Sequence, residues 1–564
     1  MVKGQEVSTE ESSSTLVPPV LQRSKSGNLA LTAVFCCVLA LTILLQTLGG
    51  AYTSEFSGYP DEPAHFITGL MIRDYVLAGL PESPVKYAED YYFHYPKVAF
   101  GMWGPLLHVS EAAWTIIFPA NRMSLLILMA LFSSITAALL FSALLDEVAG
   151  VLAFLAALLF ICVPTVQAYT GMVMADGLVA LLDFCAALAF GRYLNSGKPR
   201  DSALFGIFAC LGILTKGNAV ALVLLPAFAI AFTRRFSLLK KPTFWIGPAI
   251  IGCIGGPWQY YSTRLLSGIL ERNAAGSFLP FYTKTIATVL GLGLLPFILA
   301  GLYSRFLAPA LRNRLDGKWA AAASLIFSVW AFHSAVPAAA PEYRYVIAVL
   351  PPLLMFLMAG VAIAAERIRI PAVSPEYRVW SVAAVVLVVF FTTAFTIPHK
   401  LYHGFDEVAD VLERPEYRDS EILVSSNANG EGMLISEMAM RERRPSHTIL
   451  RASKMLAQSD WNGQRYRATY TTPEQILNYL RRIGVSIVVI DNDPGSDSFA
   501  HHALLRKTIE AFPSEWSAVG TYPRQREPQI AAHIDVYKLR SEPGSHRDKI
   551  RIDLPHTLGH EIER

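Results

Sequence analysis

The 564-residue sequence contains few charged residues. Asp, Glu, Lys and Arg make up 16% of it, the formal net charge is +3, and 53% of the residues are hydrophobic. So little charge is unusual for a soluble domain and typical of a polytopic membrane protein. The near balance of acidic and basic residues also excludes a broad basic surface of the kind that binds nucleic acid.

Cysteine is scarce and confined to apolar segments. No CxxC pair occurs, and the polar region after residue 398 contains no cysteine. The sequence therefore predicts neither a disulfide framework nor a cysteine-ligated zinc site. The six cysteines are Cys36, Cys37, Cys162, Cys185, Cys210 and Cys253.

Several motifs with known chemistry are also missing. The sequence has no GxxxxGK[ST], HExxH or GxSxG pattern, so an ATP-driven pump, a zinc protease and an α/β-hydrolase receive no support. Two weaker patterns occur near the C-terminus. "SIVVIDNDPGSD" places Asp491 and Asp493 after a predicted strand, like the DxD metal site of nucleotide-sugar transferases, and "SSNANGEGM" is partly glycine-rich. We interpret both as ordinary strand-ending turns, because Asp, Asn, Pro and Gly are the common turn residues.

Long apolar runs dominate residues 28–397. A helix needs roughly 20 apolar residues to cross a hydrocarbon core of about 30 Å, which predicts about eleven spans. The preceding residues 1–27 are polar and Ser-rich, typical of a disordered tail. The predicted spans are 29–49, 122–145, 150–166, 176–194, 201–214, 217–233, 244–262, 284–304, 318–337, 345–365 and 378–397.

Basic residues collect in alternate loops, which predicts the orientation. They lie near residue 198 and in 233–242, 304–318 and 366–370. Since cytoplasmic loops carry an excess of Lys and Arg, we expect a cytoplasmic N-terminus. A long first loop, 50–121, and the C-terminal region would then be extracytoplasmic. Neither outer segment has an N-x-[ST] sequon, which favours a bacterial plasma membrane over the endoplasmic reticulum.

The first outer loop has two apolar stretches, 63–80 and 100–118. Polar residues such as His108 and Glu111 interrupt them, which favours helices lying in the membrane interface. We expect the aromatic residues of this loop, among them Tyr91, to lie at the level of the lipid headgroups.

Residues 398–540 change character, because predicted helices alternate with short β-branched runs. This pattern predicts a soluble α/β domain with a small sheet. We expect residues 541–564 to form a loose polar tail. The predicted helices are 405–414, 431–442, 472–483 and 501–512, and the predicted strands are 421–426, 486–491 and 532–539. The predicted fold is thus a polytopic α-helical membrane protein with a C-terminal α/β domain.

Two acids, Asp61 and Glu62, follow the first span in "GYPDEPAHFITG". They have a structural interpretation, because Pro63 suits the first position of a helix and a preceding acid can cap it. They also have a functional one, because a carboxylate fixed at a helix end can accept a proton or bind a cation. His65 would lie one turn further on and is a candidate metal ligand with both acids. Of the two, Asp61 is the better candidate catalyst and Glu62 the better candidate cap.

Other charged residues are predicted on the same outer side. Asp176 lies at the outer end of the fourth span, where a carboxylate is costly unless it faces water, a cation or a partner. Lys97, Lys216 and Arg344, the last followed by Tyr345, supply cations. Each cation alone is typical of a snorkelling anchor. Together with the acids they would form a polar patch suited to a lipid phosphate and a polar acceptor.

The order of these features resembles the GT-C membrane glycosyltransferases, of the protein O-mannosyltransferase and lipid A aminoarabinose transferase type. The resemblance covers roughly residues 29–397. It rests on the acid pair, "MWGPLLHV", Asp176, "LTKGNAVALVLLP", "GPWQYY" and "YRYVIAVLPPLL". One departure is that relatives often have "PPL" after a basic residue or histidine, whereas "WGPLL" here follows Lys97 by several residues.

The resemblance implies a transferase that moves a sugar, with inversion, from a polyprenyl-phosphate carrier to a lipid, glycan or protein acceptor. It implies that Asp61 is the base or organises a divalent metal ion, and that Asp176 is the second acid. Glu62 is included among the candidate catalytic residues, and Lys97, Lys216, Arg344 and Tyr345 are candidate substrate ligands. The reaction itself needs a base for the acceptor hydroxyl and positive charge for the departing phosphate.

Two other classes remain open. A polyprenyl-lipid or glycolipid flippase would share the membrane architecture, although such transporters often have repeated halves and charges near the bilayer midplane. No internal repeat is evident, and the polar residues gather at one face. A non-catalytic membrane scaffold with an outer binding domain is the third possibility.

Overall fold

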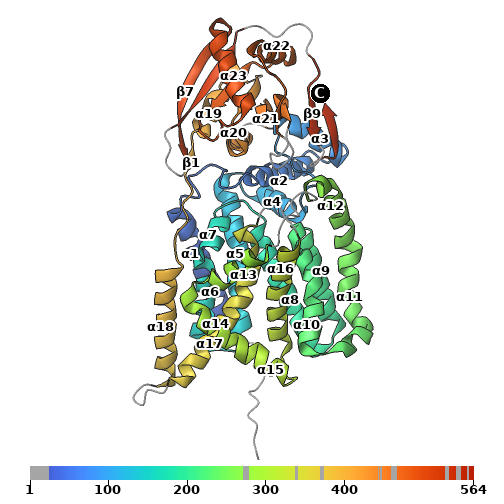
Figure 1. Ribbon diagram of the computed structural model, residues 1–564, viewed down its shortest axis with the longest axis vertical. Coiled ribbons are helices and arrows are strands. Elements are labelled where there is room, and N and C mark those ends of the chain that lie inside the picture. Colours follow the sequence, from blue (N-terminus) through green and yellow to red (C-terminus); the bar gives the residue numbers. More distant parts are fainter. Residues whose placement is uncertain are drawn as a thin grey trace, which may run out of the picture.

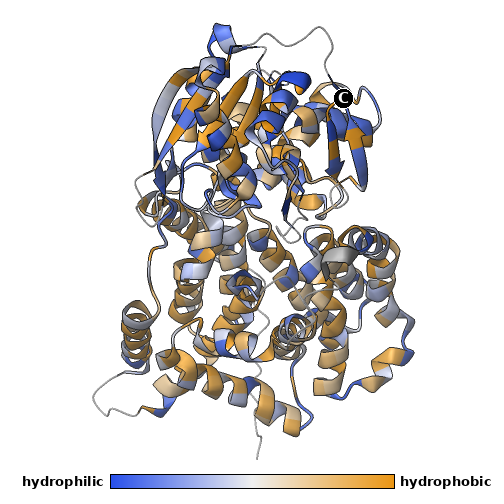
Figure 2. Cartoon of the chain, turned by 45° about the horizontal axis from the view of Figure 1, so that its top comes forward, coloured by the Kyte–Doolittle hydropathy of each residue, from blue (hydrophilic) through white to orange (hydrophobic). Residues whose placement is uncertain are grey.

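The computed structural model describes residues 25–270, 278–336, 341–368, 374–418, 420–441, 444, 447–458, 466–526, 532–540, 548–554 and 558–564. A bundle of helices carries a smaller α/β domain at one end, and the helices of the first outer loop lie between them (Figure 1). The bundle is largely hydrophobic, whereas the end domain mixes hydrophilic and hydrophobic residues (Figure 2). The predicted fold class is confirmed. Residues 1–24 of the predicted tail 1–27 lie outside the described part of the chain, and α1 begins at Lys25.

Six of the described helical segments are long and apolar enough to cross a membrane. A seventh arises if α6 and α7, which meet at a 59° bend, count as one broken span. Pro164 at the start of α7 accounts for the break, because proline cannot donate to the preceding turn. The six segments are Gly27–Leu48 (within α1, Lys25–Leu48), α5 (Arg122–Leu144), α8 (Asp176–Ser196), Leu292–Leu311, Tyr343–Arg367 and α18 (Pro375–Thr393), and the bent pair is α6 (Gly150–Cys162) and α7 (Pro164–Thr170).

The predicted count of about eleven spans is therefore not confirmed within the described part of the chain. The other predicted spans fall on segments that are shorter, broken or less apolar. Pro248, for example, lies inside α11, and a π-helical turn follows it before α12 begins. These segments are α9 (Pro199–Ile213), η1 (Gly217–Leu224) with α10 (Leu225–Thr233), α11 (Pro242–Ile250) with η3 (Ile251–Gly255) and α12 (Gly256–Leu270), and α16 (Gly317–Ala335).

Shorter elements complete the bundle. The span Leu292–Leu311 consists of η4 (Leu292–Leu294), α14 (Leu295–Leu302), η5 (Tyr303–Leu307) and α15 (Ala308–Leu311). The span Tyr343–Arg367 consists of η6 (Tyr343–Val349) and α17 (Leu350–Arg367), and α13 (Leu279–Thr288) and η2 (Phe236–Lys240) are separate short helices.

The outer loop forms α2 (Glu62–Leu77), α3 (Pro84–His94) and α4 (Leu106–Ile117). Three of its aromatic residues do not face lipid as expected. Tyr91 and Tyr92 are each 3% exposed and Tyr95 is fully buried. They belong to a hydrophobic cluster that also contains Leu434 and other residues of the end domain. The expectation was wrong because the sequence does not reveal that the end domain covers this loop.

The end domain contains a six-stranded sheet in the order β1-β7-β8-β6-β2-β3. Strands β3, β2 and β6 are parallel, whereas β8 and β7 add in antiparallel fashion. All residues of β6, "IVVID", are buried, as expected for a parallel strand covered on both faces. The sheet strands are β1 (Tyr402–His403), β2 (Glu421–Ser425), β3 (Thr448–Arg451), β6 (Ile487–Asp491), β7 (Trp516–Arg526) and β8 (Ala532–Leu539), and β4 (Ala457–Gln458) pairs with β5 (Arg467–Ala468).

The helices of this domain are α19 (Phe405–Leu412), α20 (Ala428–Arg441), α21 (Ala452–Met455), α22 (Pro473–Ile483) and α23 (Ala500–Ala511), with 3₁₀ turns η7 (Pro415–Tyr417) and η8 (Pro513–Glu515). All four predicted helices and all three predicted strands have counterparts here. The sequence analysis missed β3 and β7.

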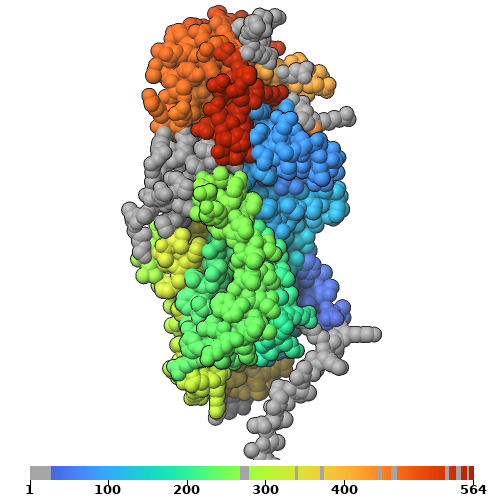
Figure 3. Space-filling view, turned by 90° about the vertical axis from the view of Figure 1, so that its right-hand side faces the viewer, coloured from blue at the N-terminus to red at the C-terminus, as the bar shows by residue number. Residues whose placement is uncertain are grey.

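The C-terminal end differs from the loose tail that we expected, although residues 541–547 lie outside the described part. Strands β9 (Arg551–Leu554) and β10 (His560–Glu563) form an antiparallel pair with buried Ile552 and Ile562. His560 Nε2 lies 2.7 Å from Glu89 Oε1 of α3. Figure 3 shows this red segment lying against the blue surface of the outer loop. The C-terminal end therefore helps to join the end domain to the loop.

Two glycines determine how closely α14 and α17 approach. A Cβ atom added to Gly301 would lie 1.8 Å from the carbonyl oxygen of Phe356, and one added to Gly360 would lie 1.9 Å from that of Phe297. We expect Gly360→Ala to force the two helices apart and to destabilise the protein by about 1–3 kcal/mol, the usual cost of overpacking. A thermal melt of the detergent-solubilised chain measures this loss.

Gly150→Ala is the matched control, because a Cβ atom added there meets nothing within 4 Å. Equal melting temperatures for Gly360→Ala and Gly150→Ala would contradict the proposed close contact.

Candidate active site

A network of charged side chains lies at the end of the bundle that faces the outer loop. It joins four of the residues predicted from the sequence, each from a different segment. Asp61 immediately precedes α2, Asp176 is the first residue of α8, Lys216 precedes η1, and Arg344 lies in η6. Helix ends thus bring the four side chains together. Their chemical roles remain predictions.

Arg344 is the centre of one half of the network. Its Nη1 atom lies 3.4 Å from Asp61 Oδ2, and its Nη2 donates to Glu342 Oε1 at 3.0 Å. The guanidinium carbon also lies 4.3 Å from the centroid of the Tyr59 ring, a cation–π contact. The Arg344 side chain is only 6% exposed. The buried guanidinium thus places positive charge beside both acids.

Lys216 and Asp176 form the other half. Lys216 Nζ donates to Asp176 Oδ1 at 2.8 Å, and both side chains are largely buried. The second oxygen of Asp176 has no hydrogen-bond partner among the described residues. Tyr345 connects the halves, because its ring centroid lies 5.2 Å from Lys216 Nζ and 5.5 Å from the guanidinium carbon of Arg344.

Asp61 is held loosely compared with the other acids. Its side chain is 16% exposed and makes no capping hydrogen bond to α2. Burial raises the pKa of Asp61 above its usual value, while Arg344 and Lys216 oppose the shift. A carboxylate with a raised pKa is a stronger base than an ordinary aspartate. These properties suit the role predicted for Asp61 as a base, which stays a prediction.

Glu62 is held in a different way. It is fully buried, and Lys400 Nζ donates to its two oxygens at 2.8 and 2.9 Å. The backbone amides of Val173 and Gly58 donate to the same carboxylate at 3.1 and 3.2 Å. Both oxygens of Glu62 are occupied, so it joins segments of the chain instead of presenting a free carboxylate.

His65 is paired with a second histidine. His65 Nδ1 lies 3.1 Å from His108 Nε2, and its ring lies 4.2 Å from that of Trp103. Burial lowers the pKa of both imidazoles, that of His108 to about 3. The predicted metal ligands Asp61, Glu62 and His65 do not form a metal site in this structure. Among the described residues, no group of three His, Cys, Asp or Glu side chains could hold one.

Lys97 lies against the end domain. Its Nζ donates to the carbonyl oxygen of Ala428, at the start of α20, at 3.0 Å. Burial lowers the pKa of Lys97 to about 7, and the nearby Arg451 contributes to the shift. Lys97 is thus a cation that can lose its proton near neutral pH, unlike Arg344.

An apolar groove approaches the backbone beside Lys216. It has a volume of about 460 Å³ and lies between α9, η1 and the α11–α12 segment. Its lining includes Ile213, Val220 and Ile251, with Gln259 as a polar member. A Cβ atom added to Gly217, the neighbour of Lys216, would lie 3.2 Å from Gln259 Oε1. One wall of the groove thus adjoins the residue that follows Lys216.

Sequence reasoning missed Tyr59, Glu342 and Lys400. Glu342 and Tyr59 lie two residues before Arg344 and Asp61, so proximity in sequence was a usable signal. No local signal marks Lys400, because its partner Glu62 lies 338 residues away.

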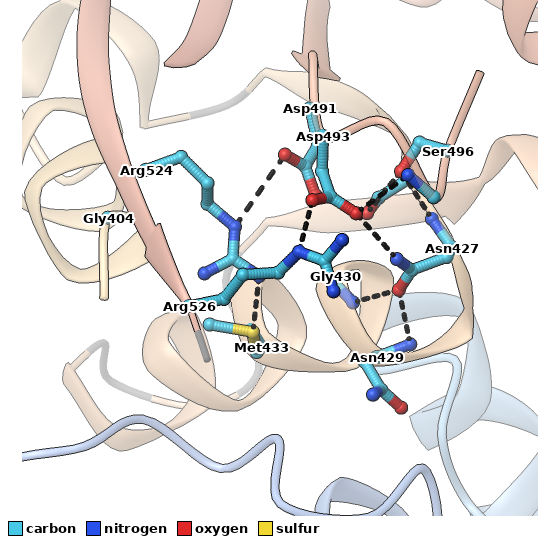
Figure 4. Close-up of polar contacts among 12 residues, drawn as sticks. Gly404, Asn427, Asn429, Gly430, Met433, Asp491, Asp493, Ser496, Arg524 and Arg526 are labelled. Atoms are coloured by element: carbon cyan, nitrogen blue, oxygen red, sulfur yellow. Dashed lines mark hydrogen bonds and ion pairs between the residues drawn. The ribbon is translucent and has the colours of Figure 1, made fainter. Parts of the chain in front are cut away.

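The DxD-like segment forms a separate buried cluster in the end domain (Figure 4). Ser426 Oγ donates to Asp491 Oδ2 at 2.6 Å, and Arg524 Nε lies 3.6 Å from Asp491 Oδ1. Asp493 is paired with Arg526 and accepts from the side chain of Asn427. Arginines of β7 thus neutralise both aspartates, consistent with the interpretation as a turn.

A family model described as dolichyl-phosphate-mannose-protein mannosyltransferase matches residues 105–261. No curated protein matches the chain in sequence. Among solved structures, the chain is similar to ArnT from Cupriavidus metallidurans bound to undecaprenyl phosphate. The TM-score is 0.58 at 12% identity, over 93% of this chain and 100% of that one.

The chain is also similar to the oligosaccharyltransferase of Archaeoglobus fulgidus in the apo form. The TM-score is 0.56 at 13% identity, over 89% of this chain and 74% of that one. The same enzyme in complex with Zn and sulfate gives a TM-score of 0.51 at 13% identity, over 89% and 72%. These matches confirm the resemblance to the GT-C superfamily and show that the chain has its fold.

Glu111 of α4 is buried near the histidine pair without a hydrogen-bond partner for either oxygen among the described residues. Its carboxyl group lies over Gly69, where an added Cβ atom would be 2.3 Å from Glu111 Oε2. Burial raises the pKa of Glu111 well above its usual value. Burial therefore favours the protonated form of Glu111.

We expect Glu111→Gln to change the pH dependence of stability. The pKa of Glu111 is higher in the native protein than in the unfolded chain. At pH values between the two, the native state keeps a proton on Glu111 that the unfolded state has lost. Stability therefore falls with rising pH, by at most about 1.4 kcal/mol per pH unit for one group. Glu111→Gln removes this loss, so its melting temperature should exceed that of the parent at pH 7 and approach it at pH 4.5. A constant difference at both pH values would contradict a raised pKa of Glu111.

Proposed function

We propose that the protein is an integral-membrane glycosyltransferase that moves a sugar from a polyprenyl-phosphate carrier to an acceptor at the extracytoplasmic face. The observation that carries this proposal is the position of Asp61. It lies beside Arg344, within a network that includes the Lys216–Asp176 pair, and Gln259 of an apolar groove approaches Gly217, the neighbour of Lys216. A base, two cations and a site for an apolar chain are what transfer from a lipid phosphate requires.

The comparisons support the class of donor. The matching family model is described by a dolichyl-phosphate-linked sugar, and ArnT was solved with undecaprenyl phosphate. Both carriers are polyprenyl phosphates, so we infer the same class here. The groove beside Lys216 would hold the first isoprene units, and the rest of the tail would extend into lipid.

In the proposed reaction the acceptor hydroxyl attacks the anomeric carbon. Asp61 takes the hydroxyl proton, and the bond between the anomeric carbon and the phosphate oxygen breaks with inversion. Arg344 and Lys216, with Lys97, stabilise the negative charge of the departing phosphate. Asp176 holds Lys216 in position, and Tyr345 lies between the two cations.

The Archaeoglobus structure with Zn suggests a divalent ion for that enzyme. The predicted ligands in this chain do not converge on an ion, so no step of the proposed reaction depends on one.

The orientation is also a proposal. The end domain lies at one end of the bundle and α15 at the other (Figure 1). Basic loops fall at the α15 end, where Arg235 contacts the carbonyl oxygens of Leu194 and Leu315. By the excess of Lys and Arg on the cytoplasmic side, the end domain and the proposed site would be extracytoplasmic. A bacterial plasma membrane fits this arrangement.

The decisive experiment replaces Asp61 by Asn in the purified full chain, reconstituted with a polyprenyl-phosphate sugar donor. Loss of the base should lower the rate of sugar transfer by about 10²–10⁴-fold. Asp410→Asn is the control, because Asp410 is an exposed acid of the end domain and its side chain is 68% accessible. Unchanged transfer by Asp61→Asn would refute the proposed role. Carrier translocation without transfer by the parent protein would instead indicate a flippase.

A second experiment tests Lys97 as a phosphate ligand. Because its pKa is about 7, the ammonium is lost as the pH rises through 7, and the donor should then bind more weakly. We expect the KM for the donor to rise between pH 6 and 8.5 in the parent. In Lys97→Met the KM should be high and independent of pH. Lys318→Met, at the far end of the bundle, is the control and should keep the pH dependence of the parent KM. A parent KM that does not vary with pH would exclude Lys97 as a phosphate ligand.

A further inference from the structure

The carboxylate of Glu62 joins three segments that are far apart in the sequence. The amide of Gly58 lies three residues before Asp61, and the amide of Val173 lies three residues before Asp176. Lys400 lies between α18 and the end domain. A single buried carboxylate thus contacts the backbone leading to each of the two candidate acids, and the chain leading to the end domain.

The chain around Lys400 is itself fixed to the outer loop. The amide of Lys400 donates to the carbonyl oxygen of Gly49 at 2.8 Å, and the amide of Glu55 donates to that of Tyr402 at 2.8 Å. A Cβ atom added to Gly49 would lie 2.7 Å from the carbonyl oxygen of Pro398, so the two backbones touch. Lys400 therefore approaches Glu62 from a rigid segment, which gives the ion pair a defined geometry.

The pair is also buried, so neither charge can be removed without consequence. Glu62 is 0% exposed and the Lys400 side chain 9% exposed. The ring of Phe56 lies 5.7 Å from Lys400 Nζ and closes one side. If Lys400 is lost, Glu62 remains as an uncompensated charge in an apolar site and must move or bind a proton. Either change would release Gly58 and Val173 from their present positions.

We propose that Lys400 is a positioning residue for sugar transfer, which acts through Glu62 to hold Asp61 and Asp176 at a fixed separation. The end domain would then contribute to catalysis through its connection to the bundle, without touching the reacting atoms. This inference rests on the proposed glycosyltransferase activity. It assigns Glu62 a role distinct from that of Asp61, although the two are adjacent.

The test compares Lys400→Met, Lys400→Arg and Glu62→Gln in the reconstituted full chain. Displacement of a reacting group by about 1 Å can cost on the order of 100-fold in rate, so we expect Lys400→Met to lower kcat by 10-fold to 100-fold. The KM for the donor should change much less than kcat, because Arg344, Lys216 and Lys97 all remain. Lys400→Arg keeps the charge and should recover most of kcat. The double variant Glu62→Gln/Lys400→Met should lose no more than Lys400→Met, since both residues act through one contact.

Lys318→Met is the matched control. Lys318 Nζ lies 2.5 Å from Glu147 Oε1, another partly buried Lys–Glu pair, at the opposite end of the bundle. The Lys318→Met variant should therefore leave kcat unchanged. If Lys400→Met does not fold, Glu62→Asp, which keeps the charge but shortens the side chain, should lower kcat in the same way.

The two proposals fail in different ways. If Asp61→Asn abolishes transfer while Lys400→Met and Glu62→Asp keep the parent kcat, the positioning role is wrong and the transferase stands. If the donor KM rises as much as kcat falls, Lys400 acts in donor binding and the inference is also wrong. If Asp61→Asn leaves transfer unchanged, the proposed function itself fails.

Discussion

The arrangement of this protein depends on one constraint, which is that charges at the end of an apolar helix bundle must be paired. Ion pairs satisfy this constraint at Arg344 with Asp61, at Lys216 with Asp176, and at Lys400 with Glu62. Because an isolated buried charge costs several kcal/mol, each pair fixes the segments that carry it. The positions of α2, α8, η6 and the connection to the end domain are thus determined together.

The same constraint explains why an outer loop can hold a precise site. Loops are usually the mobile parts of a structure. Here α2, α3 and α4 share a hydrophobic cluster with the end domain, and Lys97 donates directly to the backbone of α20. A Cβ atom added to Gly432 of α20 would lie 2.7 Å from Pro63 Cγ, so the two elements are in direct contact at the start of α2. The end domain therefore acts as a rigid cover for the loop that bears Asp61.

Local patterns in the sequence were enough to predict the fold class and much of the end domain. The strand "SIVVID" and the helix "TPEQILNYLRRI" are determined by residues close in sequence, including the capping box of Thr472 and Gln475. Interactions over long sequence distances were not predictable. The partner of Glu62 is 338 residues away, and the cover over Tyr91 and Tyr95 comes from the end domain. The predicted span count is not confirmed, because apolar composition does not reveal breaks such as the π turn after Pro248.

The three acids near the bundle end differ in how many hydrogen bonds their oxygens accept from the protein and in how exposed they are. This difference suggests how their roles are divided. Glu62 accepts four hydrogen bonds and is fully buried. Asp176 has one oxygen bound to Lys216 and the other without a partner among the described residues. Asp61 has one long contact with Arg344 and partial exposure. A proton acceptor needs a free lone pair and a raised pKa, and a positioning group needs neither. Asp61 is suited to accept a proton, and the closely bound Glu62 is suited to hold Asp61 in place.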